Sequence, residues 1–238
     1  MIRTTDDGAV RTITIDRPER RNALTPAALK ALETAVTDVA ARVIELRGAG
    51  SAFCAGADLD VVADLAADAA AGTTDQAAAF ARLGQRVARA IETSDAVVVA
   101  GIDGPARGGG LEIALACDLR IATPAASFAE PGVTFGLFGA WGGTHRLTAT
   151  VGRSHARDIA LSGRVVDAEQ ALDMGLVSRV VDTPRSVAEE IADCERETLT
   201  RLKSLMNTAE TADRTIQEER EANVFAALVD ANADTLQS

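Results

Sequence analysis

The chain has 238 residues, of which 47% are hydrophobic, enough to fill one large core or one core with a small appendage. Its formal net charge of −11 argues against a nucleic-acid partner or an anionic membrane surface, because either would need a broad basic face. Its first residues lack the apolar core of a signal peptide, and no apolar run approaches the roughly 18 residues that span a bilayer. We therefore expect a soluble, cytoplasmic protein.

Strand and helix signals alternate along the first half of the chain. Residues 9–15 alternate in hydrophobicity as a strand does, and a helix is expected to begin where Thr25 precedes Pro26. The apolar stripe of this helix consists of Leu29, Leu32, Val36 and Val39. Apolar runs at 43–46 and 96–102 each lead into a glycine-bearing turn and then into helical sequence. This repetition predicts an α/β fold in which helices cover a parallel sheet.

The rest of the chain is less regular. Residues 60–79 are rich in alanine and aspartate, a composition that suits a helix but offers few large side chains to anchor it, so we expect a mobile segment. Helical patterns dominate further on, at 187–205 and 216–229. We therefore divide the chain into a core, residues 1–182, and a shortened helical region, residues 183–238.

The most informative stretch is 104–118, where three glycines end an apolar strand and open a helix with Glu112 in its first turn. Without Cβ atoms, such a turn lets a ligand approach the backbone N–H groups, and the positive end of the helix dipole favours an anion there. A second turn of small residues, 51–59, follows the strand at 43–46 and supplies another N–H. Two such turns predict an oxyanion hole.

These motifs occur in the order found in the crotonase superfamily, whose best-known member is enoyl-CoA hydratase, and the chain resembles that family over nearly its whole length. The stretches that carry the resemblance are residues 17–24, 55–58, 108–112, 141–147, 161–164 and 171–179. The resemblance implies an α/β fold built as a spiral of ββα units, with a C-terminal helical trimerisation region. It also implies a homotrimer or a dimer of trimers, and a role in fatty acid metabolism.

The resemblance further implies that the amides of Ala57 and Gly109 hold the thioester oxygen of an acyl-CoA substrate while Glu112 positions and activates water. Adding to an enoyl thioester puts negative charge on that oxygen, and losing one donor from a comparable hole costs about 2.7–4 kcal/mol. Coenzyme A enters only as part of the substrate, so no separate cofactor is expected. No cluster of histidine, cysteine and carboxylate residues has metal-ligand spacing, and no metal is expected either.

The expected substrate contacts also come from the resemblance. Arg20 and Arg21 lie in the best local basic cluster, where they either contact phosphate or are ordinary solvated arginines. Small residues and backbone atoms would line the path of the coenzyme and the thioester; these are Ala23, Ala55, Asp58, Leu59 and Gly108. Trp141 either forms a wall of the acyl pocket or packs in the core.

One position departs from the family pattern. Family hydratases carry a second glutamate, the proton donor, where this chain has Gly132. Glu130 precedes it by two residues, so in extended backbone it would face the same side and is a candidate replacement; otherwise it is a surface or salt-bridged residue. We interpret the chain as an enoyl-CoA hydratase-like lyase. The alternatives are another enolate reaction of acyl-CoA, by an isomerase, decarboxylase or thioester hydrolase, or a non-catalytic acyl-CoA binder.

Overall fold

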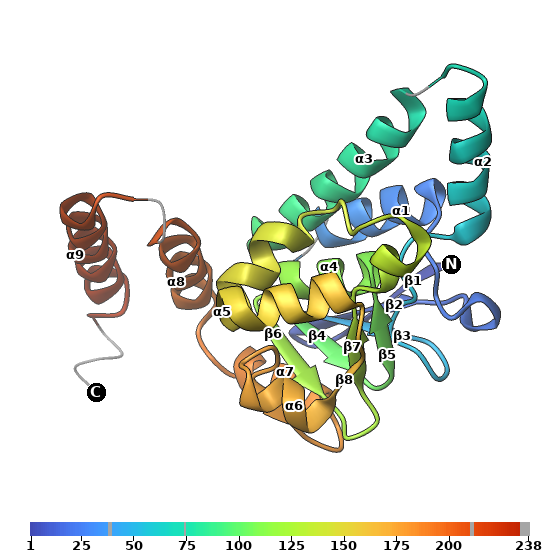
Figure 1. The fold of residues 1–238 in the computed structure, drawn as a ribbon. Helices are drawn as coiled ribbons and strands as arrows, with labels where there is room; N and C mark the ends of the chain where they lie inside the picture. Colours follow the sequence, from blue (N-terminus) through green and yellow to red (C-terminus); the bar gives the residue numbers. More distant parts are fainter. Residues whose placement is uncertain (38–39, 74, 210–211, 234–238) are drawn as a thin grey trace.

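The computed structural model describes the whole chain except residues 38–39, 74, 210–211 and 234–238. Within these described residues the main sheet has the strand order β1-β2-β3-β4-β6-β9 (Figure 1). The strands are β1 (Ile2–Asp7), β2 (Val10–Ile15), β3 (Val43–Gly48), β4 (Val97–Ile102), β6 (Leu119–Ala122) and β9 (Arg179–Val180). β1 pairs with β2 in antiparallel fashion and the other neighbours are parallel, so the sheet is mixed.

Helices cover both faces of this sheet, which is why all six residues of β4 are buried. On one face, Val98 and Ala100 belong to the large core formed with α1 (Pro26–Thr37), α3 (Asp75–Glu92) and α4 (Gly109–Ala116). On the other face, the alternate residues Val97 and Val99 pack in a smaller cluster with α7 (Arg185–Ala192). The alternation of side chains along the strand therefore divides the core into two layers.

A second sheet brings the two parts of the candidate site together. It contains β5 (Pro105–Arg107), β7 (Ser127–Ala129) and β8 (Val166–Asp167). β5 and β7 are parallel, with Arg107 opposite Ala129, and the Gly108 amide donates to the Ala129 carbonyl oxygen at 3.0 Å. The residues that follow these strands, Gly108 and Glu130, therefore leave the sheet side by side.

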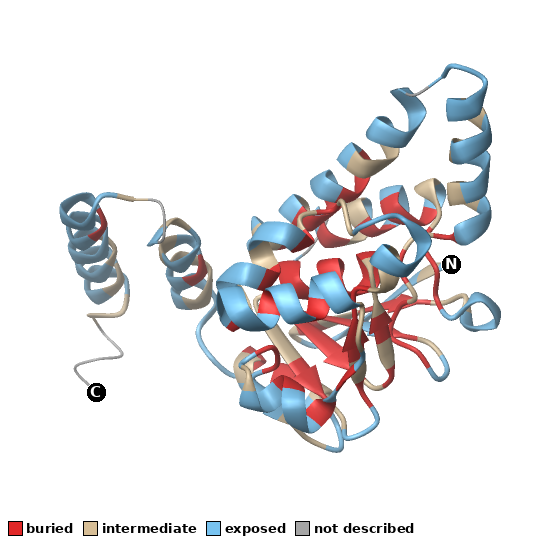
Figure 2. Cartoon of the chain, in the orientation of Figure 1, coloured by how far each residue is buried: buried red, intermediate tan, exposed pale blue. Residues whose placement is uncertain are grey.

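The remaining helices surround the site or extend away from it. They are α2 (Leu59–Ala70), α5 (Gly143–Ser162), α6 (Ala168–Asp173), α8 (Arg196–Ala209) and α9 (Arg214–Ala231), with the 3₁₀ helices η1 (Pro18–Arg20) and η2 (Pro131–Phe135). Figure 1 shows α8 and α9 to one side of the sheet, and Figure 2 shows that most of their surface is exposed. We call these two helices the arm.

Most elements of the first half agree with expectation. Strands cover the apolar runs at 9–15, 43–46 and 96–102, and a helix begins at Pro26 as predicted. Val39 lies outside the described residues. Cys54 and Cys117 are buried free cysteines. β1 is an additional strand, and because it is antiparallel the sheet is not wholly parallel as the sequence had suggested.

Two helical segments need comment. Residues 60–79 contribute to α2 and α3, so this segment forms helices as its composition indicated. α2 has no buried residue. The mobility expected of this segment stays a prediction. The helix expected over 187–205 is wrong as a single unit, because α7 ends at Ala192 and α8 begins at Arg196. The reason is local capping: the Glu195 carboxylate accepts hydrogen bonds from the amides of Glu197 and Thr198 and so starts a new helix.

Candidate active site

The two small-residue turns predicted from the sequence lie against each other. The Arg107 amide donates to the Cys54 carbonyl oxygen at 2.9 Å, which joins the end of β5 to the turn before α2. Gly108, with a φ of +48°, then turns the chain into α4. A Cβ atom on Gly56 would lie 2.9 Å from the Gly109 amide nitrogen. Both turns therefore need glycine, because any side chain would force them apart.

Ala57 and Gly109 each present an amide at this junction. The flanks of Ala57 are fixed by Leu24, whose amide donates to the Gly56 oxygen at 2.7 Å and whose own oxygen accepts from the Asp58 amide at 3.0 Å. In the part of the chain that the structure describes, neither the Ala57 nor the Gly109 amide donates to another protein group. Gly109 is the first residue of α4, whose dipole adds positive potential there.

Glu112 is buried one helical turn further along α4, with 1% of its surface exposed. Its Oε1 atom accepts hydrogen bonds from the amides of Trp141 at 2.9 Å and Gly143 at 2.6 Å. A Cβ atom on Gly139 would lie 2.7 Å from the carboxyl carbon, so this loop fits closely around the acid. Burial raises the pKa of Glu112, while the two amides and the charge of Arg146 oppose that rise. Its Oε2 atom is buried and has no partner among the described residues.

Glu130 is the second buried carboxyl group, with 7% of its surface exposed. Neither of its side-chain oxygens has a hydrogen-bond partner in the described structure. Burial, and then the like charge of Glu112, raise the pKa of Glu130 to about 8. The surface or salt-bridged role considered for this residue is therefore wrong: Glu130 is an unpaired acid in the electrostatic field of Glu112.

A cavity of about 180 Å³ adjoins this pair of acids. Glu130 lines it directly, and Gly139 and Gly143, which pack on the Glu112 carboxylate, line it as well. The rest of the lining is mainly apolar and includes Val133, Phe138, Leu147, Ala156, Ala160 and Leu161. Gly132 lies outside this lining, and a Cβ atom on it would be 3.0 Å from the Phe138 Cα atom. A side chain at 132 would therefore need the following loop to move.

Trp141 is buried, with 3% of its surface exposed, and its indole lies between the glycine turn and α3. A Cβ atom on Gly109 would overlap the six-membered ring, and one on Gly84 would overlap the pyrrole side. The Phe80 ring meets the indole edge-to-face, with ring centroids 5.7 Å apart. Trp141 therefore packs in the core, one of the two roles considered for it, and its ring also touches the glycine turn; its role as a wall of the acyl pocket stays a prediction.

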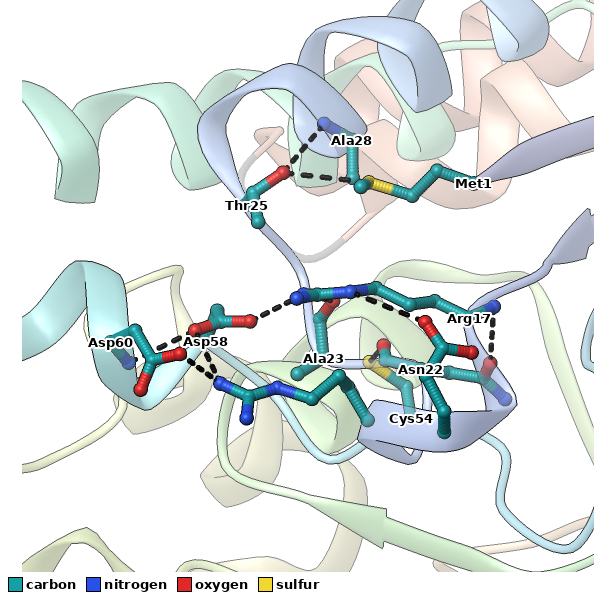
Figure 3. A network of polar contacts seen from close by, with 11 residues as sticks. Met1, Arg17, Asn22, Ala23, Thr25, Ala28, Cys54, Asp58 and Asp60 are labelled. Atoms are coloured by element: carbon teal, nitrogen blue, oxygen red, sulfur yellow. Dashed lines mark hydrogen bonds and ion pairs between the residues drawn. The ribbon is translucent and has the colours of Figure 1, made fainter.

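The basic cluster expected to hold the coenzyme is largely engaged with acids (Figure 3). Asp58 is buried, with 2% exposed, and pairs with the guanidinium groups of Arg17 and Arg20. Arg20 also pairs with Asp60, whose amide donates to the Asp58 carboxylate at 2.9 Å to cap α2. Asp58 thus fixes the turn that carries Ala57. Arg21 is exposed and forms no ion pair with any described residue.

The other expected contact residues divide by exposure. Ala23 is buried, Ala55, Ala57 and Gly108 are partly exposed beside the junction, and Leu59 is exposed at the start of α2. Sequence reasoning missed Gly84 and Phe80, because nothing in the pattern of α3 links it to a tryptophan far along the chain. Within the described ranges, no group of three or more His, Cys, Asp or Glu residues is placed to hold a metal ion.

Comparison with known proteins adds to this geometry. The sequence profile of the enoyl-CoA hydratase/isomerase family matches residues 5–236. The chain belongs to this family. It is 35% identical over 194 residues to the short-chain-enoyl-CoA hydratase of Clostridium acetobutylicum, covering 79% of this chain and 72% of that protein. It is 37% identical over 182 residues to the crotonyl-CoA hydratase of Syntrophomonas wolfei, covering 74% and 67%.

Solved structures of other proteins share this fold. The enoyl-CoA hydratase of Bacillus anthracis superposes with a TM-score of 0.88 at 29% identity, covering 96% of this chain and 91% of that one. Pseudomonas aeruginosa DspI superposes with a TM-score of 0.87 at 32% identity, covering 96% and 88%. The expected crotonase-type α/β fold and membership of an enzyme family are thereby confirmed. No helix among the described residues is long and apolar enough to cross a membrane.

Proposed function

We propose that this protein adds water to the double bond of a 2-enoyl-CoA thioester. One observation carries the proposal: among the described residues, the free oxygen of Glu112 and both oxygens of Glu130 are buried without partners, near two backbone amides that donate to no described group. Buried polar atoms normally find partners, so a set left unpaired at one site is suited to a ligand. A thioester oxygen can accept hydrogen bonds from the two amides. Of the two carboxyl groups, one can take a proton from a water molecule and the other can supply a proton.

The proposed step balances as follows. Glu112 Oε2 takes a proton from water as the water oxygen forms a bond to the β-carbon of the substrate. The π electrons of the double bond move towards the thioester carbonyl, and the enolate oxygen is held by the amides of Ala57 and Gly109. Glu130 then gives its proton to the α-carbon. Transfer of the proton from Glu112 to Glu130 restores both groups.

The surroundings of the two acids support this division of roles. Glu112 receives two amide hydrogen bonds and lies near the positive charge of Arg146, all of which favour its ionised form. Glu130 receives no hydrogen bond from any residue that the structure describes and is buried beside a like charge, which favours its protonated form. When the pair holds a single proton, that proton therefore resides on Glu130, and Glu112 is the base.

A non-catalytic acyl-CoA binder is the second candidate, and Gly132 favours it. The position that carries the second acid in family hydratases has no side chain here, and the loop of Leu137 and Phe138 closes over it. If Glu130 does not reach the α-carbon, the site would bind a thioester without moving a proton. Another enolate reaction of acyl-CoA that runs with Glu112 alone is the related alternative.

The deciding experiment follows hydration of crotonyl-CoA through loss of the absorbance of its conjugated thioester, with binding of butanoyl-CoA measured by calorimetry in parallel. Turnover together with binding supports the proposed reaction. Binding without turnover supports the non-catalytic binder or another enolate reaction. Absence of both would overturn the acyl-CoA site itself. Turnover that persists in a chelator would agree with the proposal that no metal or separate cofactor takes part.

The proposal extends to coenzyme binding and assembly. Arg21, exposed and without an ion pair in the described structure, is the arginine that we assign to a coenzyme phosphate. The arm presents exposed apolar side chains, namely Leu202, Met206, Ile216, Phe225 and Val229, which suit packing against another copy of the chain. We assign the arm to a homotrimer or a dimer of trimers, which light scattering on a sizing column would test.

A further inference from the structure

Trp141 fills the space between the glycine turn at Gly109 and α3. Its six-membered ring lies where a Cβ atom on Gly109 would project, and its pyrrole side lies against Gly84 of α3. The indole thus fills the interval between the oxyanion turn and α3, and the Phe80 ring supports it edge-to-face. Because aromatic rings in such contact resist displacement, this side of the site is closed to an acyl chain.

The backbone around Trp141 holds the indole in place. The Trp141 amide donates to Glu112 Oε1 at 2.9 Å, and the Trp141 carbonyl oxygen accepts from Arg146 Nη1 at 3.0 Å. Arg146 in turn forms a two-pronged ion pair with Glu92 at the end of α3. The preceding carbonyl, of Ala140, accepts from Gln85 Nε2 at 2.9 Å. Both sides of the tryptophan are therefore tied to α3, the helix against which its ring packs.

The open space beside the acids is small. The cavity lined by Glu130 and Phe138 measures about 180 Å³, below the roughly 300–1,000 Å³ of pockets that enclose drug-sized ligands. Its mainly apolar lining, including Leu147 and Leu161, suits a hydrocarbon group, and Glu130 is the acidic residue of that lining. With the α3 side filled by the indole, this cavity can take a short acyl group.

We propose that Trp141 is the residue that determines acyl-group size, by closing the α3 side of the site so that only short acyl-CoA thioesters place their carbonyl on Gly109. This inference rests on the proposed acyl-CoA site but not on hydration as the reaction, because the same steric limit applies to binding. The specificity follows from Trp141 together with Gly84 and Gly109, the two glycines that leave room for its ring.

The first test compares kcat/KM for crotonyl-CoA, octenoyl-CoA and dodecenoyl-CoA. We expect the wild type to favour crotonyl-CoA over dodecenoyl-CoA by at least about tenfold, and Trp141→Ala to reduce that preference by about tenfold or more. Trp141→Phe should lie between them. Leu32→Ala, which truncates a fully buried side chain of α1, is the control for lost core packing and should leave the preference unchanged. An unchanged preference in folded Trp141→Ala would overturn the inference.

A second test needs no variant and no turnover. The sequence contains one tryptophan and no tyrosine, so the emission excited at the tryptophan band comes from Trp141 alone. Butanoyl-CoA should change this emission, whereas coenzyme A without an acyl group should not, and dodecanoyl-CoA should bind at least about tenfold more weakly. Saturation by butanoyl-CoA with no change in Trp141 emission would overturn the contact.

The two tests separate the inference from the proposed reaction. If no enoyl-CoA is hydrated but binding depends on chain length through Trp141, the size limit stands and the hydration proposal fails. If hydration is fast but dodecenoyl-CoA is used as well as crotonyl-CoA, the reaction stands and the size limit fails. Should Trp141→Ala not fold, Trp141→Phe and the wild-type emission still decide the matter.

Discussion

The two buried carboxyl groups of the site lie in opposite surroundings. Glu112 is enclosed by the loop 139–143, which supplies two amide hydrogen bonds to one of its oxygens. Glu130 lies at the end of β7 and faces a mainly apolar cavity, and neither of its oxygens accepts a hydrogen bond within the described part of the chain. Both are almost fully buried, so desolvation affects both; the difference lies in the supply of donors.

In the proposed reaction, this difference lets one site hold a base and an acid of the same chemical type. Hydrogen bonds to Glu112 stabilise its charge, and that charge in turn raises the pKa of Glu130. Two glutamates with matched surroundings would compete for a single proton, whereas here the surroundings favour the proton on Glu130 and the charge on Glu112. The proposed assignment of base and acid therefore rests on backbone amides rather than on the identity of the side chains.

The largest expected effect comes from removing the base. Glu112→Gln keeps the size of the side chain but cannot accept a proton from water, so hydration should fall by about 10²–10⁴-fold. Butanoyl-CoA affinity should stay within a few-fold of wild type, because the oxyanion amides remain. The exposed Glu169→Gln is the matched control and should retain full activity. Hydration by Glu112→Gln at more than a tenth of the wild-type rate would remove Glu112 from the mechanism.

The proposed acid role of Glu130 predicts an alkaline limb in the pH profile, which is a fall in kcat/KM towards high pH. Glu130 must hold its proton to act, and its pKa lies at about 8, so kcat/KM should fall as the pH rises through about 8. In Glu130→Gln the rate should be lower by about 10²-fold and this limb should be absent. Steady-state rates across the pH range, measured with crotonyl-CoA, provide the check. A limb that persists in Glu130→Gln belongs to another group.

The same pKa predicts a dependence of stability on pH. The pKa of Glu130 rises from 4.5 to about 8 on folding, so the folded state retains a proton that the unfolded chain loses between these values. Its contribution to the free energy of unfolding is therefore fully present below the lower value and is lost as the pH rises through about 8. Between those limits the free energy of unfolding of the wild type should fall by about 5 kcal/mol relative to that of Glu130→Gln, as measured by urea unfolding. If the free energy of unfolding depended on pH in the same way in both proteins, Glu130 would not have a raised pKa in the folded state.

Sequence reasoning reached the parts of the site that are encoded locally. The glycine turn at 108–110, the small-residue turn at Ala57 and the helix start at Glu112 each have a signature within a few residues, and the structure brings them together. The strands at 43–46 and 96–102 were predictable for the same reason, since buried parallel strands are continuously apolar.

What could not be predicted depends on pairings across the fold. The burial of Glu130 follows from the register that places Ala129 opposite Arg107, and no local pattern encodes that register. The position of the Trp141 indole depends on Gly84, which leaves room for the ring. From sequence alone, a glycine within a helix indicates only a weaker helix-forming tendency at that residue. The break between α7 and α8 was encoded locally, by Glu195 as a capping residue, and was overlooked.

The smallest effect tests what keeps the surroundings of Glu112 different from those of Glu130. Ala is a better helix former than Gly by about 1 kcal/mol, so Gly84→Ala would stabilise α3 if nothing lay against it. With Trp141 present, however, the Cβ atom of an alanine at position 84 would overlap the indole, and overpacking of this kind costs about 1–3 kcal/mol. We therefore expect Gly84→Ala to destabilise the wild type and to slow turnover, because the Trp141 amide that holds Glu112 would shift.

In a Trp141→Ala background the overlap is absent, so the same substitution should be neutral or stabilising. Urea unfolding of the four proteins in this double-mutant cycle measures the coupling between the two positions. The pH limb assigned to Glu130 should stay near its wild-type position in Gly84→Ala, because that substitution disturbs the loop 139–143 rather than the end of β7. Additive effects of the two substitutions would mean that the Trp141 indole does not fill the space beside Gly84.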